Sequence, residues 1–151
     1  MTRPPRSVLA LGYAGLLPPL AAIVVWLSGS VPPDAPFLGV LLIGGLLYGG
    51  LILSFLGGMW WGAACAGRQG AALRPWLTLA VMPSLIALAA LLAGIHNPRV
   101  GGASLSVALA ATLLVDQRLL QNGLVPDWWM SLRVPLSLGL AAEMIILGLI
   151  I

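Results

Sequence analysis

Long apolar stretches dominate this sequence and constrain its fold more than any other feature. Each is close to the length of about 20 residues that a helix needs to cross a hydrocarbon core of about 30 Å. Short polar or Pro/Gly-rich breaks separate them. We therefore predict an all-α integral membrane bundle of five transmembrane helices, at about 8–28, 36–65, 76–94, 100–118 and 134–151.

Composition points to the same class of protein. Of 151 residues, 60% are hydrophobic and 7% are charged, whereas a soluble domain carries about 25% charged residues. A soluble fold of this size leaves too much of its chain facing water to hide so much apolar surface. No linker-like segment divides the chain, so residues 1–151 are predicted to form a single transmembrane domain. A signal peptide is a rival interpretation of 8–28, but Pro18 and Pro19 interrupt that run and no small-residue cleavage site follows.

The arginines predict the orientation, because the chain contains no lysine. Successive loops of a multi-span protein lie on alternate sides of the membrane. Arg99 is the only arginine in a loop expected on one side, and the other arginines lie in loops or helix ends expected on the opposite side. This positive-inside bias predicts a cytoplasmic N-terminus and an outside C-terminus. We expect a multi-pass protein of the bacterial inner (cytoplasmic) membrane. The net charge of +3 then reflects topology and contact with lipid, with no nucleic-acid partner.

Tryptophan and arginine gather on the predicted cytoplasmic side. One interpretation is an aromatic belt, because indole prefers the headgroup level. The other is a pocket walled by both residue types, for an anionic amphiphile or a planar ring. The predicted aromatic and basic ring comprises Trp60, Trp61, Trp76, Trp128, Trp129, Arg68, Arg74, Arg118 and Arg133.

Small residues recur along the second predicted helix. At helical spacing they would form a groove that lets another helix approach closely, which is how helices gain contact in lipid. The groove would pack either within the chain or against a partner protein, and it makes this helix the expected centre of the bundle. Its predicted members are Gly45, Gly49, Gly50, Ser54, Gly58 and Gly62.

Two prolines are predicted at membrane depth, Pro18 in the first helix and Pro83 in the third. Each removes a backbone hydrogen bond and is expected to kink its helix. Neighbouring helices must satisfy the freed carbonyl group, because lipid cannot. Such kinks either leave a cavity in the bundle or are purely structural.

Residues for chemistry are scarce. The single cysteine, Cys65, and the single histidine, His96, predict no metal site and no bound cofactor. Asp116 and Asp127 lie near the predicted cytoplasmic edge, where we interpret them as solvated partners of Arg118 and Arg133, with little effect on stability. No catalytic motif is found, and we do not expect an enzyme.

Glu143 is the exception. It follows Arg133 by ten residues, which at about 1.5 Å per residue places it near the bilayer midplane. A carboxyl group there must be protonated or paired, and intramembrane acids are functional candidates. Its hydrogen-bond partner would be a group of another protein or one of the side chains of Tyr48, Ser54 and Thr112. It is either a satisfied neutral acid or a functional group.

Three segments resemble one known family. They are LGYAGLLPPL at 11–20, YGGLILSFLGGMWWG at 48–62, and Asp116 followed by LVPDWWMSLRVPLSLGL at 124–140. Together they are similar to the membrane family typified by transmembrane protein 69, described as domain of unknown function 3429. The resemblance implies a small multi-span protein of the bacterial or mitochondrial inner membrane. It implies no particular activity, and its pattern has no acid at the position of Glu143.

We therefore expect function within the membrane plane or at the headgroups. The first hypothesis is a non-catalytic accessory subunit or assembly factor that binds other integral membrane proteins laterally, in a respiratory or photosynthetic complex. The alternative is a binder or carrier of a lipid or other amphiphile. A small proton-coupled transporter is third, since one buried acid supports it weakly.

Overall fold

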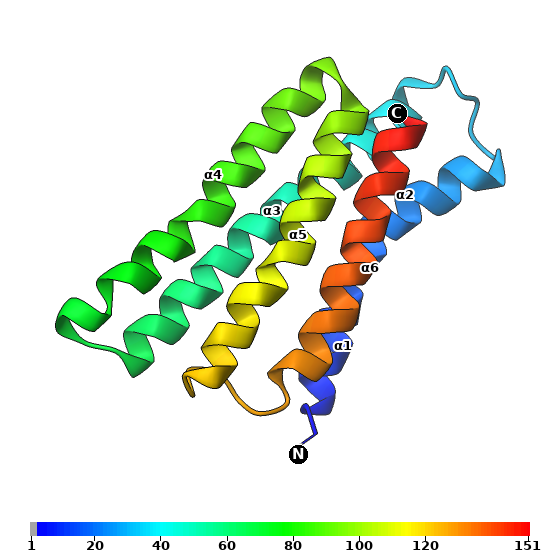
Figure 1. Cartoon of the computed structure of the whole chain (residues 1–151). Helices are drawn as coiled ribbons and strands as arrows, with labels where there is room; N and C mark the ends of the chain where they lie inside the picture. The colour runs from blue at the N-terminus through cyan, green and yellow to red at the C-terminus, as the bar shows by residue number, and fades with distance from the viewer. Residues whose placement is uncertain (1–2) are drawn as a thin grey trace.

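The computed structural model describes residues 3–151, and this part of the chain is helical with no strand. The prediction of an all-α fold is confirmed. Short loops join successive helices, which run back and forth along one direction (Figure 1). The elements are α1 (Arg6–Ala14), α2 (Leu17–Ser28), α3 (Pro36–Gly67), the 3₁₀ helix η1 (Gly70–Ala72), α4 (Arg74–His96), α5 (Pro98–Gln121) and α6 (Trp129–Ile150).

Four helices, α3 to α6, are each long and apolar enough to cross a membrane. The helices α1 and α2 meet that test together, as a pair bent by 42°, and count as a fifth span if the pair is taken as one. The chain ends lie at opposite ends of the bundle, as an odd number of spans requires (Figure 1). Which end faces the cytoplasm stays a prediction.

The first span differs from the continuous helix predicted for 8–28. Pro18 and Pro19 lack the N–H groups that would bond the carbonyl groups of Ala14 and Gly15 in a continuous helix. The chain therefore ends α1 at Ala14 and begins α2 at Leu17, with Pro18 in the first turn of the new helix. Pro18 consequently starts a helix and does not kink the interior of one. Pro83 does lie inside α4, as predicted, and Pro135, which we did not single out, lies inside α6.

The remaining helices extend beyond their apolar stretches at most ends. For example, α6 begins at Trp129 and α5 begins at Pro98. Polar residues supply these ends: the Asn97 side chain accepts hydrogen bonds from the backbone N–H groups of Arg99 (3.1 Å) and Val100 (3.4 Å). Because hydropathy detects only the lipid-facing part, it misses such capped turns.

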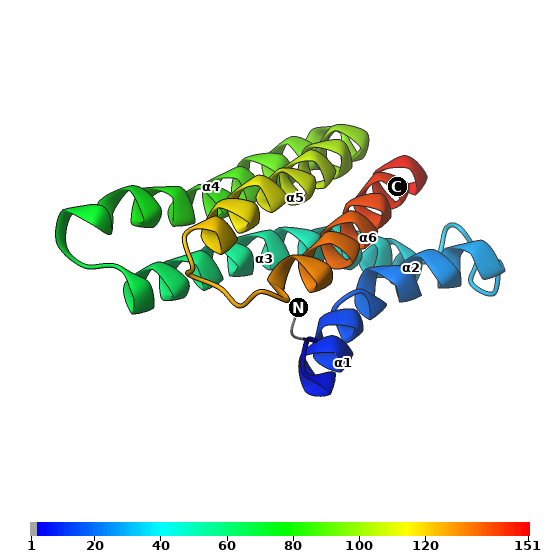
Figure 2. The ribbon, with the colours of Figure 1, turned by 60° about the horizontal axis from the view of Figure 1, so that its bottom comes forward.

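The helix α3, which we predicted to be the centre of the bundle, shares that position with α6: each contacts four other helices. The helix α3 contacts α2, α4, α5 and α6, while α5 and α6 form an antiparallel hairpin beside it (Figures 1 and 2). The helices α1 and α2 lie along the side formed by α3 and α6 (Figure 2). The core between these helices holds fully buried apolar side chains, among them Leu53, Leu105, Leu109, Met144 and Leu147.

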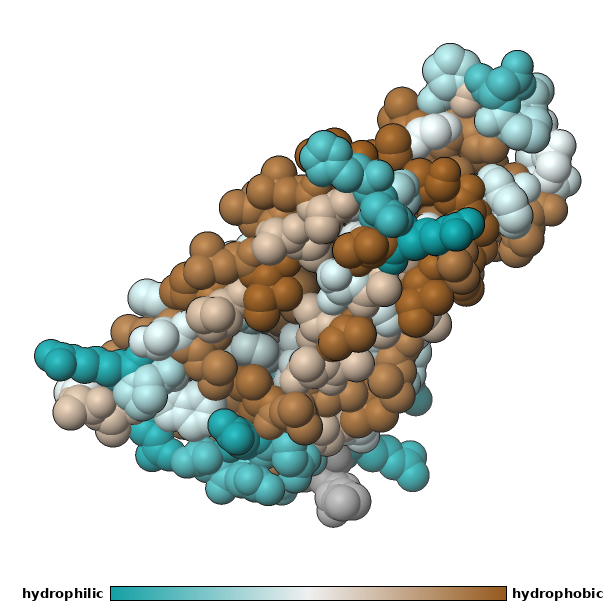
Figure 3. Space-filling view, turned by 45° about the horizontal axis from the view of Figure 1, so that its top comes forward, coloured by the Kyte–Doolittle hydropathy of each residue, from teal (hydrophilic) through white to brown (hydrophobic). Residues whose placement is uncertain are grey.

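The outer surface is apolar along the flanks of the helices. Figure 3 shows hydrophobic side chains over the body of the molecule and hydrophilic ones gathered toward the helix ends. Many large hydrophobic residues are exposed on every long helix, for example Leu51 at 67% and Leu114 at 71%. Such a surface is suited to lipid and would be a severe liability in water.

Part of the predicted glycine groove packs as expected. A Cβ atom at Gly45 would lie 2.9 Å from Leu147 Cδ1 of α6, and one at Gly50 would lie 2.7 Å from Leu91 Cδ1 of α4. A Cβ atom at Gly49 would collide with the side chain of Met144. These glycines therefore set how closely α4 and α6 approach α3.

Gly58 and Gly62 do not pack within the bundle, which was one of the two alternatives for the groove. A Cβ atom at either would meet nothing within 4 Å, whereas one at Gly57 would collide with the carbonyl oxygen of Ala80. The reason is helical geometry. At about 100° per residue, a spacing of four drifts by about 40° at each step, so Gly58 turns away from the line of Gly50 while Gly57, seven residues on, stays on it.

Candidate functional site

An ion pair joins α5 and α6 near the loop between them. Asp116 lies five residues before the end of α5 at Gln121, and Arg133 lies four residues after the start of α6 at Trp129. The antiparallel hairpin therefore brings both side chains to the same depth. Arg133 Nε donates to Asp116 Oδ2 at 2.8 Å, and the exposed fractions of the two side chains are 7% and 0%.

Two indoles complete the surroundings of the Asp116 carboxylate. Its Oδ1 atom accepts hydrogen bonds from Trp60 Nε1 of α3 at 2.9 Å and from Trp129 Nε1 at 3.2 Å. Arg133 Nη2 donates to Thr112 Oγ1 at 3.4 Å, and that hydroxyl donates to the carbonyl group of Leu109 at 2.6 Å. We call these five residues the Asp116 cluster: Trp60, Thr112, Asp116, Trp129 and Arg133. It ties α3, α5 and α6 together.

This burial corrects the prediction that Asp116 is solvated and has little effect on stability. The partner Arg133 was identified correctly, but a carboxylate that is 0% exposed and accepts hydrogen bonds from three side chains is part of the core. The signal in the sequence was the symmetry of the hairpin, because Asp116 and Arg133 are nearly equidistant from the α5–α6 loop. Arg118, the other predicted partner, is exposed.

The predicted ring of tryptophans and arginines does not form as one unit. Trp60, Trp129 and Arg133 converge on Asp116, and the Trp128 ring lies beside that of Trp129 with their centroids 6.1 Å apart. Within residues 3–151, the other members make no hydrogen bond to the Asp116 cluster. Trp76 packs near Trp60, and Arg68 donates to Asn122 Oδ1 at 3.0 Å. The exposed members of the predicted ring are Trp61, Arg74 and Arg118.

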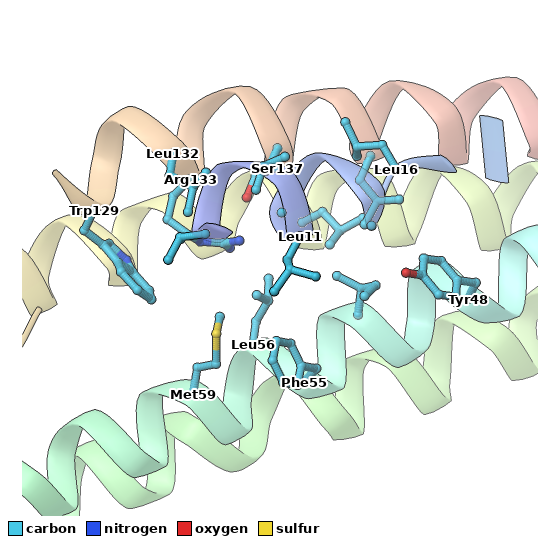
Figure 4. Close-up of a pocket in the computed structure, with 17 residues that line it drawn as sticks. Leu11, Leu16, Tyr48, Phe55, Leu56, Met59, Trp129, Leu132, Arg133 and Ser137 are labelled. Atoms are coloured by element: carbon cyan, nitrogen blue, oxygen red, sulfur yellow. The ribbon is translucent and has the colours of Figure 1, made fainter. Parts of the chain in front are cut away.

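A cavity of about 440 Å³ extends from the Asp116 cluster between α1, α3 and α6. Trp129 and Arg133 lie at one end, and Tyr48 lies at the other with its hydroxyl directed toward the interior (Figure 4). Apolar side chains form most of the wall between these ends. They include Leu11, Leu16, Ile52, Leu56, Met59, Leu132, Leu136 and Leu140.

The cavity has an open rim. Leu11 of α1 and Phe55 of α3 both line it, although they are 76% and 61% exposed. No residue of α1 is buried, so this short helix covers the cavity without packing tightly on it. Gly15 and Leu16, at the α1–α2 bend, are also part of the wall. Of the two alternatives for the proline-containing first span, a cavity or a purely structural role, the α1–α2 break accompanies a cavity.

One buried polar atom in the cavity wall has no partner in the described chain. Ser137 is 2% exposed and lines the wall one helical turn beyond Arg133. Its Oγ atom is buried and forms no hydrogen bond with any residue of the described chain. Buried hydroxyl groups are normally satisfied, so this one is an exception within the described chain.

Glu143 is buried in the bundle, with an exposed fraction of 8%. The predicted hydrogen bonds to Tyr48, Ser54 and Thr112 are not present: Oε2 is buried without a partner among residues 3–151. Ser54 bonds instead with Ser84 of α4, at 2.8 Å between the two Oγ atoms. The side chains of Tyr48, Ser54 and Thr112 therefore either bond with other elements or lie on other faces of the bundle.

Replacing Glu143 tests this description of its surroundings. We expect Glu143→Leu to raise the thermal unfolding temperature of the purified protein in detergent, because it removes a buried polar atom that lacks a partner. Glu143→Gln should change the unfolding temperature less, since it keeps a polar group of similar shape. A lower unfolding temperature for the Leu variant would contradict the description and indicate a polar contact at Glu143.

The fold and cavity define a multi-pass α-helical membrane protein with an internal apolar site. Over the described chain, no group of His, Cys, Asp and Glu is arranged to hold a metal ion. The family model described as "Protein of unknown function (DUF3429)" matches residues 4–150, and the chain belongs to this family. The resemblance of its three segments is thereby confirmed.

A curated relative supports the same assignment. Transmembrane protein 69 of Xenopus tropicalis is 31% identical over 136 residues, which cover 88% of this chain and 50% of the relative. The chain thus spans about half the length of that protein. No solved structure is significantly similar to the chain.

Proposed function

We propose that this protein is a non-catalytic binder of a membrane amphiphile, held in the cavity between α1, α3 and α6. The observation that supports this function most directly is the cavity itself: most of its wall is apolar, Arg133 and Ser137 lie toward one end, and the Tyr48 hydroxyl is the polar group at the other. An amphiphile has the same division between an apolar chain and a polar head. Such concave sites with a few convergent polar groups are typical of ligand pockets.

The size and position of the cavity suit this ligand. Its volume of about 440 Å³ is within the range of roughly 300–1,000 Å³ for ligand sites. A cavity of about 150 Å³ holds one benzene ring, so this one has room for a ring and a chain. Because Leu11 and Phe55 form an exposed rim, the ligand would enter laterally from the bilayer.

Filling the cavity with a larger side chain tests the proposal. Ile52 lines the cavity, and Ile52→Trp would place an indole in the ligand's space. We expect wild-type protein, purified in mild detergent, to retain an amphiphile in native mass spectrometry and the Trp variant to lose it.

The matched control is Leu51→Trp. Leu51 is the neighbouring residue on α3, is 67% exposed and is not part of the cavity wall. This variant should retain the same bound species as wild type. If Ile52→Trp retains it as well, or if wild type carries only a random sample of membrane lipid, the proposed function is wrong.

A second candidate function is lateral binding to another integral membrane protein, as an accessory subunit or assembly factor. Gly58 and Gly62 support it, because they form an uncovered small-residue face on the central helix α3, where glycine permits close helix contact. A respiratory or photosynthetic complex of the bacterial inner membrane is the proposed partner. The Gly58→Leu variant described in the Discussion tests this candidate.

A further inference from the structure

We infer that the head of the bound amphiphile is a neutral hydrogen-bond acceptor, a carbonyl group on a planar ring, received by Ser137 and Arg133. The inference rests on the proposed function and names the class of ligand. The two side chains lie one turn apart on the same face of α6, at the polar end of the cavity (Figure 4).

Ser137 provides a donor that nothing in the described chain uses. Its Oγ atom is buried in an apolar wall without a hydrogen-bond partner. Leaving such a group unsatisfied costs about 1–3 kcal/mol. A ligand acceptor at this position would remove that cost, and a purely hydrocarbon ligand would not.

Arg133 provides further donors beside it. Its Nε atom is bound to Asp116 and its Nη2 atom to Thr112. The Nη1 atom donates to no residue in the part of the chain that the structure describes. Arg133 and Ser137 are four residues apart on α6 and both line the cavity. An arginine offers five N–H donors in a planar fork, and we place the ligand's acceptor between this fork and the Ser137 hydroxyl.

The charge of the Asp116 cluster argues against an anionic head. The Asp116 carboxylate, 2.8 Å from Arg133 Nε, already compensates the arginine, so the pair is neutral overall. An anionic head would find Arg133 already neutralised by Asp116. Its own charge would then be unpaired inside an apolar cavity, which costs free energy. None of the other arginines lines this cavity. A neutral acceptor gains the available hydrogen bonds without that penalty.

Aromatic side chains in the wall favour a planar ring. Trp129 lies next to Arg133, and Phe55 contributes a ring from α3 on the opposite side (Figure 4). Aromatic rings bind planar ligands through offset-stacked or edge-to-face contacts. A ring carbonyl near Ser137 would leave the attached chain to follow the leucine-lined wall toward Tyr48.

Three probes with the same decyl chain separate the head groups. They are decyl-1,4-benzoquinone, decylbenzene and decyl phosphate, each measured by equilibrium binding to purified wild-type protein in one detergent. We expect the quinone to bind most tightly, decylbenzene more weakly and decyl phosphate most weakly. Tighter binding of decyl phosphate than of the quinone would overturn the inference in favour of an anion.

Ser137→Ala is the decisive variant. Its affinity for the quinone should fall about three- to tenfold, the effect of one lost hydrogen bond, while its affinity for decylbenzene stays unchanged. The variant should fold at least as well as wild type, because the hydroxyl has no partner in the described chain. Ser106→Ala is the control: Ser106 is buried at 7% but lies outside the cavity wall, so binding should not change.

The outcomes distinguish this inference from the proposed function. If Ile52→Trp abolishes binding of the quinone but Ser137→Ala leaves its affinity unchanged, the cavity holds amphiphiles and the inference about the head group is wrong. If Ile52→Trp changes the binding of none of the three probes, the proposed function fails with it. An equal loss of quinone and decylbenzene in Ser137→Ala would also overturn the inference.

Discussion

Asp116→Ala is expected to lower the free energy of unfolding by about 3–5 kcal/mol, because it leaves the buried Arg133 guanidinium without its counter-charge. Asp116 Oδ1 also accepts from Trp60 and Trp129, so two indole N–H groups lose their acceptor in the same substitution. Equilibrium unfolding of the purified protein in mixed detergent micelles, followed by tryptophan fluorescence, measures the loss.

Two further variants control this experiment. Asp127→Ala removes an exposed carboxylate that forms no ion pair in the described chain, and it should change stability by less than about 0.5 kcal/mol. The double variant Asp116→Leu with Arg133→Met replaces the pair by apolar groups and should recover part of the stability, because buried ion pairs are often no better than such packing, although the Trp60 and Trp129 N–H groups still lack their acceptor. Near wild-type stability of Asp116→Ala would show that the Asp116 cluster does not hold the helices together.

Gly57→Leu should destabilise the protein by about 1–3 kcal/mol or more, or prevent it from folding. A Cβ atom there already collides with the carbonyl oxygen of Ala80 and would lie 3.3 Å from Pro83 Cγ, so α3 and α4 would be forced apart. Gly58→Leu is the matched control, one residue away and with open space at its Cβ position. It should leave the stability of the purified protein unchanged or slightly higher. The yield of folded protein and its thermal unfolding temperature measure both effects.

The same pair of variants tests lateral binding to a partner. If Gly58 and Gly62 contact another membrane protein, Gly58→Leu should fold normally yet lose co-migration with a larger complex in native gels of solubilised membranes. Normal folding with unchanged migration would favour lipid contact at this face. Equal destabilisation by Gly57→Leu and Gly58→Leu would contradict the packing of α3 described above.

Features with a short-range physical cause were predictable from residue types and spacing. Apolar length identified α3 to α6, because only a helix satisfies its own backbone in lipid. The helical rise predicted the position of Glu143 along α6, but not its burial against the neighbouring helices. The proline pair predicted a disruption of the first span. It did not predict that the helix would break, nor that the break would lie before Pro18, because both depend on which carbonyl groups the prolines leave without a hydrogen bond.

Features that depend on which faces meet were not predictable in the same way. The four-residue spacing of Gly50, Ser54, Gly58 and Gly62 suggested one continuous groove, but the straight path of α4 follows Gly50 and Gly57. Ser54 pairs with Ser84, so it was unavailable to Glu143. A small rotation of α3 about its axis would change each of these contacts without any change in hydropathy.

The amino-acid sequence alone determined that the chain is a helical membrane protein, how many spans it has at most, and to which family it belongs. The first two properties follow from local hydrophobicity. The family follows from the three short segments that resemble it. None of these depends on how the helices pack. Only the tertiary structure showed that Trp60, Trp129 and Arg133 surround Asp116, and that a cavity with the unpartnered Ser137 hydroxyl begins there. The cluster depends on side chains of α3, α5 and α6 meeting at one depth, and the cavity on how α1 lies against α3 and α6. Helix rotation and crossing set both, so neither is visible in the pattern along any single helix.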